Sequence, residues 1–403
     1  MRIASKSEIL KRVGATAPVI VQILPALVSG GVERGTVETA VAICKHGGRA
    51  IIISRGGPMV RHLDRAGIKH YTVDVHTKNP LRWPKIRSQL KNIFLSESVD
   101  LVHVRSRAPA WIALPTALSL GIATVSTVHG RFIASSSFKR HYNGKLLKTD
   151  HVIAISNYVK NLITSQYLGV EERLSVVHRG VDINLFNPKN VNQARIVNFV
   201  DGLAIPEDLP VIMLPARGTK WKGHHILLEA LAKIQDVPFI CLLIGAGDGK
   251  QAFVDGLVRF GKELGLEGRF RLLPIVDDMP AAMMVADVVV MPSITPEPFG
   301  RIAVEAQAMG RPIIAFDHGG AAESVIPGKT GWLAKPGDVD SLANALAAAL
   351  SLGPRQRKKL AFAARQHIKE NFSTDAMCAQ TIKIYGRVLN RSIARKKQNF
   401  KNK

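Results

Sequence analysis

The sequence predicts an α/β protein of two domains, each with a parallel sheet flanked by helices. Its 403 residues exceed what one ordinary hydrophobic core accommodates and suit two domains. A hydrophobic share of 46% and 33 glycines are typical of a folded chain, because a disordered chain lacks the apolar surface that offsets its ordering entropy. Short β-branched runs also alternate with helical patterns in two successive series, as in parallel α/β domains.

The first series predicts an N-terminal domain over residues 1–185. Its expected strands are 19–24, 50–53, 101–104, 123–128 and 151–154. After the turn Arg179-Gly180-Val181-Asp182 comes a polar, irregular stretch with two prolines, which we expect to be the domain linker over 186–208.

The second series predicts a C-terminal domain over residues 209–372. Its expected strands are 211–214, 239–244, 270–272, 288–291, 312–316 and 331–333. Helices are expected to begin near Gly223, Lys250, Pro280, Arg301, Gly320 and Asp338. Two further helices, near 355–369 and 374–390, add no strand, so we expect them to pack across the domain junction. The segment 373–403 is interpreted as a crossover helix and a basic tail.

Cysteine usage and hydropathy predict a cytoplasmic protein. Cys44, Cys241 and Cys378 are far apart and odd in number, which argues against a disulfide framework and a zinc site. Residues 1–16 show no apolar stretch with a cleavage site, so no export signal is expected. The uncharged run 108–128 contains two prolines and a glycine, and is interpreted as a helix followed by a buried strand.

The formal net charge of +24 indicates that the protein binds an anionic partner. Nucleic acid, an anionic membrane and phosphorylated substrates all fit, and charge alone does not choose among them. The segment 83–94 places apolar residues at helical spacing between basic ones, and the tail carries further lysines and arginines. Both segments fit a membrane surface. An ordinary packed helix with a solvated tail fits the same pattern.

Ligands of open α/β sheets bind beyond the carboxyl ends of the strands, so the loops there are candidate sites. Gly30 and Gly31 lie between the first strand and a helix, where glycines let a ligand approach the backbone and free N–H groups attract an anion. A simple tight turn is the alternative. In the first such loop of the second domain, Arg217 and Lys222 can converge on one phosphate, or remain as solvated charges.

Another loop, after strand 288–291, holds two carboxylates eight residues apart. Glu297 lies in the loop and Glu305 in the following helix. The first N–H groups of that helix, from Phe299 to Arg301, are expected to point towards the same ligand as the Glu297 carboxylate. Carboxylates bind sugar hydroxyls and a helix N-terminus suits a phosphate, so a sugar nucleotide fits this gap. From the residues alone, Glu305 fits a solvated helix position equally well.

These loops resemble the retaining GT-B glycosyltransferases of family 4, whose signature is Glu-x7-Glu. The resemblance covers nearly the whole chain and rests on the glycine pair, the Arg and Lys pair and the two glutamates, in the family's order. It implies the GT-B fold, with two Rossmann-like domains facing a central cleft and C-terminal helices crossing the domain junction. It also implies that Glu297 contacts the donor sugar, Glu305 the ribose, and the backbone around Phe299 and Gly300 the diphosphate.

The resemblance extends to the acceptor side. His129 ends the fourth expected strand and is similar to the family's acceptor-side histidine, although a lone histidine is more often structural. Ser156 with Asn157 is similar to the family's serine turn, and Gly245 begins a turn similar to the one near the nucleotide base. Arg179 is a departure, because the family often has Asn there, and this predicts a different acceptor side.

Three other motifs are rejected. The glycine-rich turn before Lys250 is no dinucleotide fingerprint, because Lys250 stands where the third glycine belongs, so NAD is not expected. Gly328-Lys329-Thr330 is no P-loop, because Glu323 stands in place of the first glycine. Asp338-Val339-Asp340 has a metal-ligand spacing, but Asp338 is a natural N-cap of the helix that follows, so no metal is expected.

The expected function is metal-independent transfer of a sugar from a nucleotide-diphosphate donor, UDP or GDP, to a lipid-linked glycan or lipopolysaccharide core. Retention of configuration is implied by the resemblance. No cofactor and no nucleic acid are expected. The expected catalytic residues are Glu297, His129, Arg217 and Lys222. The expected donor contacts are Gly30, Gly31, Arg217, Lys222, Gly245, Phe299, Gly300, Arg301 and Glu305.

Two alternatives stay open. One is another GT-B-like enzyme, such as a nucleotide-sugar epimerase or a phosphorylase, although no context for a phosphorylase's pyridoxal lysine is seen. The other is a basic nucleic-acid binder. The low aromatic content, 6%, and the lack of a recognisable nucleic-acid module argue against it.

Overall fold

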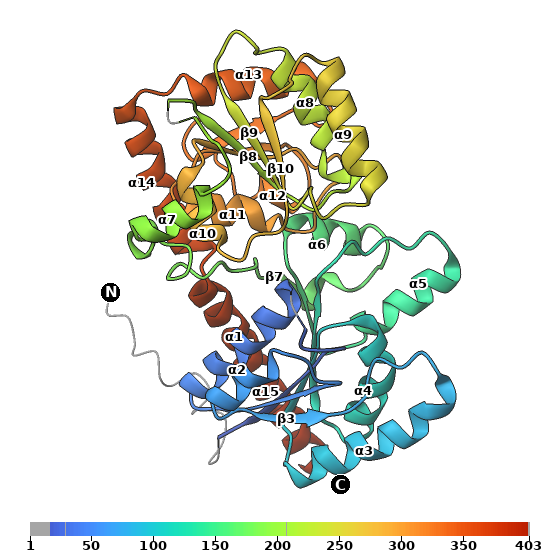
Figure 1. Ribbon diagram of the computed structural model, residues 1–403. Helices are drawn as coiled ribbons and strands as arrows, with labels where there is room; N and C mark the ends of the chain where they lie inside the picture. The colour runs from blue at the N-terminus through green and yellow to red at the C-terminus, as the bar shows by residue number, and fades with distance from the viewer. Residues whose placement is uncertain (1–16, 29, 207, 402–403) are drawn as a thin grey trace. The chain divides into compact units, whose positions relative to one another are not determined.

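The computed structural model of the chain describes residues 17–28, 30–206 and 208–401 (Figure 1). These residues divide into two compact units. Unit 1 comprises the described residues 17–180 and 374–401, and unit 2 comprises Val181–Ser373. The expected lack of an export signal concerns residues 1–16, which lie outside the described residues.

Unit 1 is built on a parallel sheet of seven strands in the order β3-β2-β1-β4-β5-β6-β7. The strands are β1 (Val19–Ile23), β2 (Arg49–Ser54), β3 (Lys69–Thr72), β4 (Leu101–Val104), β5 (Ala123–Val128), β6 (His151–Ala154) and β7 (Leu174–Val176). All residues of β1, β4, β5 and β6 are buried, as expected for a parallel sheet that is covered on both faces.

Helices cover both faces of this sheet. They are α1 (Gly31–Lys45), α2 (Val60–Arg65), α3 (Trp83–Ser96), α4 (Arg107–Ser119), α5 (Ser137–Gly144), α6 (Asn157–Thr164) and α15 (Thr374–Lys401). The C-terminal helix α15 packs against α1 and β5, and Figure 1 shows α1 and α15 side by side while α3 and α4 lie on the other side of the sheet. The fully buried Tyr385 and Ile382 anchor α15 to this core.

Unit 2 repeats the architecture with six parallel strands in the order β10-β9-β8-β11-β12-β13. The strands are β8 (Val211–Pro215), β9 (Ile240–Ile244), β10 (Phe270–Leu273), β11 (Val288–Met291), β12 (Ile313–Phe316) and β13 (Gly331–Ala334). The helices are α7 (Gln193–Val200), α8 (His224–Ala232), α9 (Gln251–Glu263), α10 (Met279–Val285), α11 (Arg301–Ala308), α12 (Gly319–Ala322), α13 (Val339–Leu350) and α14 (Pro354–Asn371). Helix α8 packs with α9 and α13, and α11 packs with α14.

The prediction of two Rossmann-like domains is confirmed, and the predicted strands are all present. Two strands, β3 and β7, were not predicted. Both are edge strands, and β3 has the sequence Lys-His-Tyr-Thr with no fully buried residue. An edge strand needs no continuous apolar run, so the pattern that revealed the central strands is missing there.

The stretch 186–208 is less irregular than expected, because it contains α7. Asn192 caps this helix by accepting a hydrogen bond of 3.0 Å from the Arg195 N–H. Arg195 also forms an ion pair of 2.6 Å with Asp278, and α7 packs against α10 within unit 2. Tertiary contacts thus stabilise a helix of 8 residues, which is too short to be stable by itself.

The segments considered for membrane contact have ordinary packing. In α3 the four apolar residues at helical spacing, Ile86, Leu90, Ile93 and Phe94, are buried, so they do not face a membrane and the packed-helix interpretation is right. The run 108–128 forms almost all of α4 and the whole of β5, as predicted. Among the described helices, none combines the length and the apolar character needed to span a bilayer. Part of the basic tail extends α15, and Lys403 lies outside the described residues.

Candidate functional site

Four loops of unit 2 lie at the carboxyl edge of its sheet. They follow β8, β9, β11 and β12. These four strands lie next to one another in the sheet, in the order β9-β8-β11-β12. The strand order reverses between β8 and β11, and this is where open α/β sheets bind their ligands. The predicted donor residues of unit 2 lie on these loops and at the start of α11.

The loops after β8 and β11 are locked together at Gly223. This residue has a φ of +81°, and a Cβ atom on it would lie 1.8 Å from the carbonyl oxygen of Pro292. Only glycine permits this approach. The Ile294 N–H donates a backbone hydrogen bond of 2.8 Å to the same loop after β8. Lys222 directly precedes Gly223, and Glu297 follows Pro292 in the loop after β11. The contact therefore brings the two side chains within reach of each other.

Lys222, Ser293 and Glu297 form a largely buried group, called the Lys222–Glu297 cluster below. Lys222 Nζ lies 2.6 Å from Glu297 Oε1, and the two side chains are 15% and 13% exposed. Ser293 Oγ donates to the same Oε1 at 2.5 Å. His318 Nε2 lies 2.7 Å from the Ser293 carbonyl oxygen. Within the described residues, Glu297 Oε2 has no hydrogen-bond partner, so it is available to a ligand hydroxyl.

The loop after β12 supports Glu297 from its backbone side. The Gly320 N–H donates to the Glu297 carbonyl oxygen at 2.8 Å. A Cβ on Gly319, whose φ is +67°, would lie 2.7 Å from that oxygen, and a Cβ on Gly320 would lie 2.4 Å from the Pro298 carbonyl oxygen. These two glycines therefore let the loop pack directly on the backbone of Glu297.

The start of α11 places the second glutamate. Gly300, with a φ of +87°, precedes the helix, and Phe299 is buried. Arg301 Nη2 lies 2.6 Å from Glu305 Oε1, one helical turn away. Glu305 is only 5% exposed, so the interpretation as a solvated helix residue is wrong. The acid is held in place by Arg301, whose side chain is 38% exposed.

Arg217 and Gly245 lie on the loops after β8 and β9. Arg217 is exposed, and no residue in the described part of the chain forms an ion pair with it. Gly245 has a φ of +83°, and its carbonyl oxygen accepts a hydrogen bond of 3.1 Å from the Gly218 N–H. The two loops thus contact each other, and Arg217 keeps its guanidinium free for a ligand.

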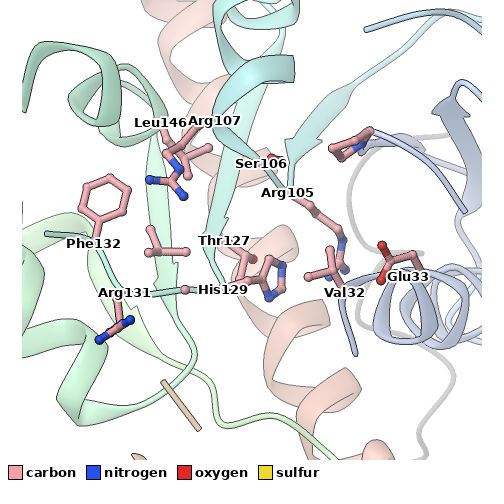
Figure 2. A pocket seen from close by; sticks show the side chains of 13 residues that line it. Val32, Glu33, Arg105, Ser106, Arg107, Thr127, His129, Arg131, Phe132 and Leu146 are labelled. Carbon is pink, nitrogen blue, oxygen red and sulfur yellow. The ribbon is translucent and has the colours of Figure 1, made fainter. Parts of the chain in front are cut away.

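Unit 1 carries a cavity of about 170 Å³ at the carboxyl ends of β1, β4 and β5 (Figure 2). The strand order reverses between β1 and β4, as it does between β8 and β11 in unit 2. The residues lining the cavity are Pro25, Val32, Glu33, Arg105, Ser106, Arg107, Thr127, Val128, His129, Gly130, Arg131, Phe132 and Leu146. The site of unit 1 therefore has the same place in its sheet as the site of unit 2.

His129 lines this cavity and is held by Arg179. Arg179 Nη1 donates to His129 Nδ1 at 3.2 Å, and Arg179 Nη2 donates to the Gly31 carbonyl oxygen. Burial, and then the charges of Arg179 and Arg105, lower the pKa of His129 well below its ordinary value of 6.5. His129 is therefore neutral at pH 7. Because a guanidinium can only donate, the ring proton of His129 lies on Nε2.

The remaining predicted residues of unit 1 lie at helix starts. Gly30 precedes α1 with a φ of +139°, a conformation that other residues rarely adopt. Ser156 Oγ accepts a hydrogen bond of 3.1 Å from the Val159 N–H and so caps α6. In unit 2, Asp338 caps α13 in the same way, as predicted.

Arg105 and Arg107 line the cavity of unit 1 and were not predicted. Arg105 is 6% exposed; its Nε donates to Gln22 Oε1 at 2.8 Å and its Nη2 to Thr39 Oγ1 at 2.9 Å. Arg107 Nη1 donates to Asn143 Oδ1 at 3.0 Å. Arg105 directly follows the buried strand β4 and Arg107 begins α4, so the rule that selected His129 after β5 would also have found them.

The predicted residues are divided between the two units. Gly30, Gly31 and His129 lie in unit 1, where Arg179 connects Gly31 with His129. The others lie in unit 2, where the structure pairs Lys222 with Glu297 and Arg301 with Glu305. Sequence reasoning missed Ser293 and His318, which position Glu297 and gave no signal beyond their place after β11 and β12.

Comparison with known proteins identifies relatives of both units. The family model "Glycosyltransferase Family 4" matches residues 29–185, and the model "Glycosyl transferases group 1" matches residues 198–367. A crystal structure of a glycosyltransferase from Rickettsia africae ESF-5 is 34% identical, with a TM-score of 0.85 over 93% of this chain and 99% of that one. Anabaena Alr3699/HepE, solved in complex with UDP-glucose, is 25% identical, with a TM-score of 0.74 over 90% of this chain and 98% of that one.

Curated relatives match over a shorter stretch. D-inositol 3-phosphate glycosyltransferase of Mycobacterium tuberculosis is 37% identical over 213 residues. The match covers 51% of this chain and 43% of the relative, so the chain spans less than half the length of these curated proteins. Both family models, and the likeness to the Rickettsia enzyme along almost all of both chains, support one conclusion. The chain belongs to the GT-B glycosyltransferases, with a family 4 N-terminal domain and a group 1 C-terminal domain.

Proposed function

We propose that this chain transfers a sugar from a nucleotide-diphosphate donor to a hydroxyl group of a glycan or glycolipid, with retention of configuration. The Lys222–Glu297 cluster carries this proposal. It joins a cation and a carboxylate at the point where the strand order of unit 2 reverses, next to the first N–H groups of α11. Family membership and the likeness to HepE, which was solved with UDP-glucose, support the proposal.

Glycosyl transfer separates charge, because the sugar becomes positive and the departing diphosphate negative. Lys222 and Arg217 lie on one loop, and in this proposal they neutralise the diphosphate together with the positive end of the α11 dipole. We propose that these groups do so in place of a metal ion. Lys222 uses one N–H for Glu297 and has two more to donate to phosphate oxygens.

The two glutamates have different roles in this proposal. Glu297 Oε2 accepts a hydroxyl of the donor sugar, while Lys222 and Ser293 keep the carboxylate in place through Oε1. Glu305 is fixed by Arg301 and accepts a ribose hydroxyl. A diphosphate oxygen removes the proton of the acceptor hydroxyl as the new bond forms on the face that the diphosphate leaves. Gly30, Gly31, Gly245, Phe299 and Gly300 complete the donor contacts through their backbones.

The acceptor proposed is a lipid-linked or lipopolysaccharide-type glycan, reached from an anionic membrane surface on the cytoplasmic side. The net charge of +24 supports an anionic surface. In unit 1, the apolar side chains of Leu81 and Phe138 are 88% and 81% exposed, next to basic residues, as in proteins that lie on membranes. Salt-sensitive co-sedimentation with anionic vesicles is the expected result, and an absence of binding would contradict the membrane part of the proposal.

The test of the transfer itself is a screen of UDP-sugars and GDP-sugars for binding and turnover. Glu297→Gln and Arg217→Ala should each reduce kcat/KM about 100- to 1000-fold, because each removes a group that acts on charge formed in the transition state. Glu263→Gln, on the exposed face of α9, is the control with the same chemical change. Full activity of the Glu297→Gln enzyme would refute the assignment. An inverted product would refute retention alone.

A further inference from the structure

The cavity of unit 1 presents an excess of positive charge and of hydrogen-bond donors. Three arginines line it, Arg105, Arg107 and Arg131, against one carboxylate, Glu33. Two positive charges are therefore left uncompensated. In Figure 2, Arg107 and Arg131 lie on one side of the cavity and Glu33 on the other, with His129 and Arg105 between them. The arginine side is thus open to an anion without contact with Glu33.

Arg105 is a buried cation whose partners are neutral. It donates to Gln22 and Thr39, and no carboxylate in the described part of the chain pairs with it. Burial lowers its pKa below the ordinary 12.5, and this effect is opposed by Tyr385, by Cys378 and, last, by Glu38. A buried charge is costly unless it is paired, so a fold that keeps Arg105 at a cavity wall gains from an anionic ligand there.

His129 adds one more donor to the same cavity. Its Nδ1 accepts from Arg179, so its proton lies on Nε2, and Nε2 is buried without a hydrogen-bond partner. Arg131 is exposed and has no ion-pair partner among the described residues. The buried Nε2 of His129 therefore needs an acceptor atom supplied from outside the protein, and the exposed Arg131 is available to the same ligand.

We propose that this cavity binds a phosphomonoester group of the acceptor, and so selects a phosphorylated acceptor for transfer. The proposal rests on the proposed function and names the acceptor class. A phosphomonoester offers three oxygens and nearly two negative charges, which matches the two uncompensated positive charges, whereas a carboxylate offers two oxygens and one charge. The cavity of about 170 Å³ has room for roughly five waters at ~30 Å³ each, enough for a phosphoryl group and its attachment. Glu33 then remains free to accept a hydroxyl of the same molecule.

The experiment compares matched ligands on the full chain saturated with UDP or GDP. Calorimetry is run with inorganic phosphate, with glucose 6-phosphate and with glucose, and co-sedimentation with phosphatidylcholine vesicles with and without phosphatidic acid. Binding of the sugar phosphate indicates a soluble or glycan-borne phosphate, and binding only to phosphatidic acid vesicles indicates a lipid headgroup. The cavity variants are Arg107→Gln and Arg131→Gln. Arg105 is left unchanged because it is buried, and its replacement would also affect the stability of the fold. Arg65→Gln, on the exposed surface of α2, makes the same chemical change away from the cavity.

We expect a phosphate ligand to bind at least about tenfold more tightly than glucose, with an affinity that falls with salt. Each cavity variant should lose about tenfold or more, and Arg65→Gln should lose nothing. If UDP or GDP binds normally but no phosphate ligand binds better than glucose, the phosphate site is refuted while the donor assignment stands. Equal losses in Arg65→Gln and the cavity variants would also refute it. Failure of every nucleotide to bind would instead count against the proposed function.

Discussion

Replacing Gly223 with alanine tests whether the contact between the loops after β8 and β11 builds the Lys222–Glu297 cluster. Gly223 has a φ of +81°, so any other residue adds about 1–2 kcal/mol of backbone strain. The new Cβ would also lie 1.8 Å from the Pro292 carbonyl oxygen, and relieving that overlap adds about 1–3 kcal/mol. The total loss of unfolding free energy should be about 2–5 kcal/mol.

Gly328→Ala separates the two contributions. Gly328 has a φ of +72°, but a Cβ on it would meet no atom within 4 Å, so its replacement costs only the backbone strain. Urea unfolding of both variants should therefore show Gly223→Ala to be less stable by about 1–3 kcal/mol. Because the overlap must push the two loops apart, Gly223→Ala should also bind the nucleotide donor more weakly, and Gly328→Ala should not. Equal stability of the two variants with unchanged donor binding would refute the reasoning.

Two further predictions concern polar groups in unit 1. Lys69, Tyr71 and Arg49 lower the pKa of Glu97 from 4.5 to about 2, so its carboxylate stabilises the fold above pH 4.5 and loses this effect as the pH falls towards 2. The unfolding free energies of the wild type and Glu97→Gln should converge over that range, and a constant difference would contradict this. Tyr385→Phe removes the hydroxyl 2.6 Å from the buried His103 Nδ1 and should cost about 1–3 kcal/mol in urea unfolding, where an unchanged midpoint would contradict it.

The fold was predictable from the sequence wherever a strand is buried on both faces. The strands 101–104, 123–128, 151–154 and 288–291 have the predicted bounds, because a continuous apolar or β-branched run is the local signature of a central parallel strand. The edge strands β3 and β7 and the short helix α7 were not predictable in this way. They are stabilised by pairing and packing with distant segments rather than by their own patterns.

The candidate site was only partly predictable. The rule that ligands bind after the carboxyl ends of strands led to His129, Arg217 and Glu297, and it applies equally to Arg105 and Arg107, which were overlooked. Family resemblance added the expectation for Glu305, whose burial the residues alone did not indicate. The roles of all these residues in donor and acceptor binding stay predictions.

The sequence by itself determined the order of the central strands, the loops that follow them, and the glycines that these loops require, because periodicity and backbone preference act between near neighbours. Only the tertiary structure decided which side chains meet. Lys222 reaches Glu297 across 75 residues of sequence, and Arg179 reaches His129 across 50. Such pairs depend on the strand order of each sheet and on close approaches such as that of Gly223 to Pro292, and no local pattern encodes them.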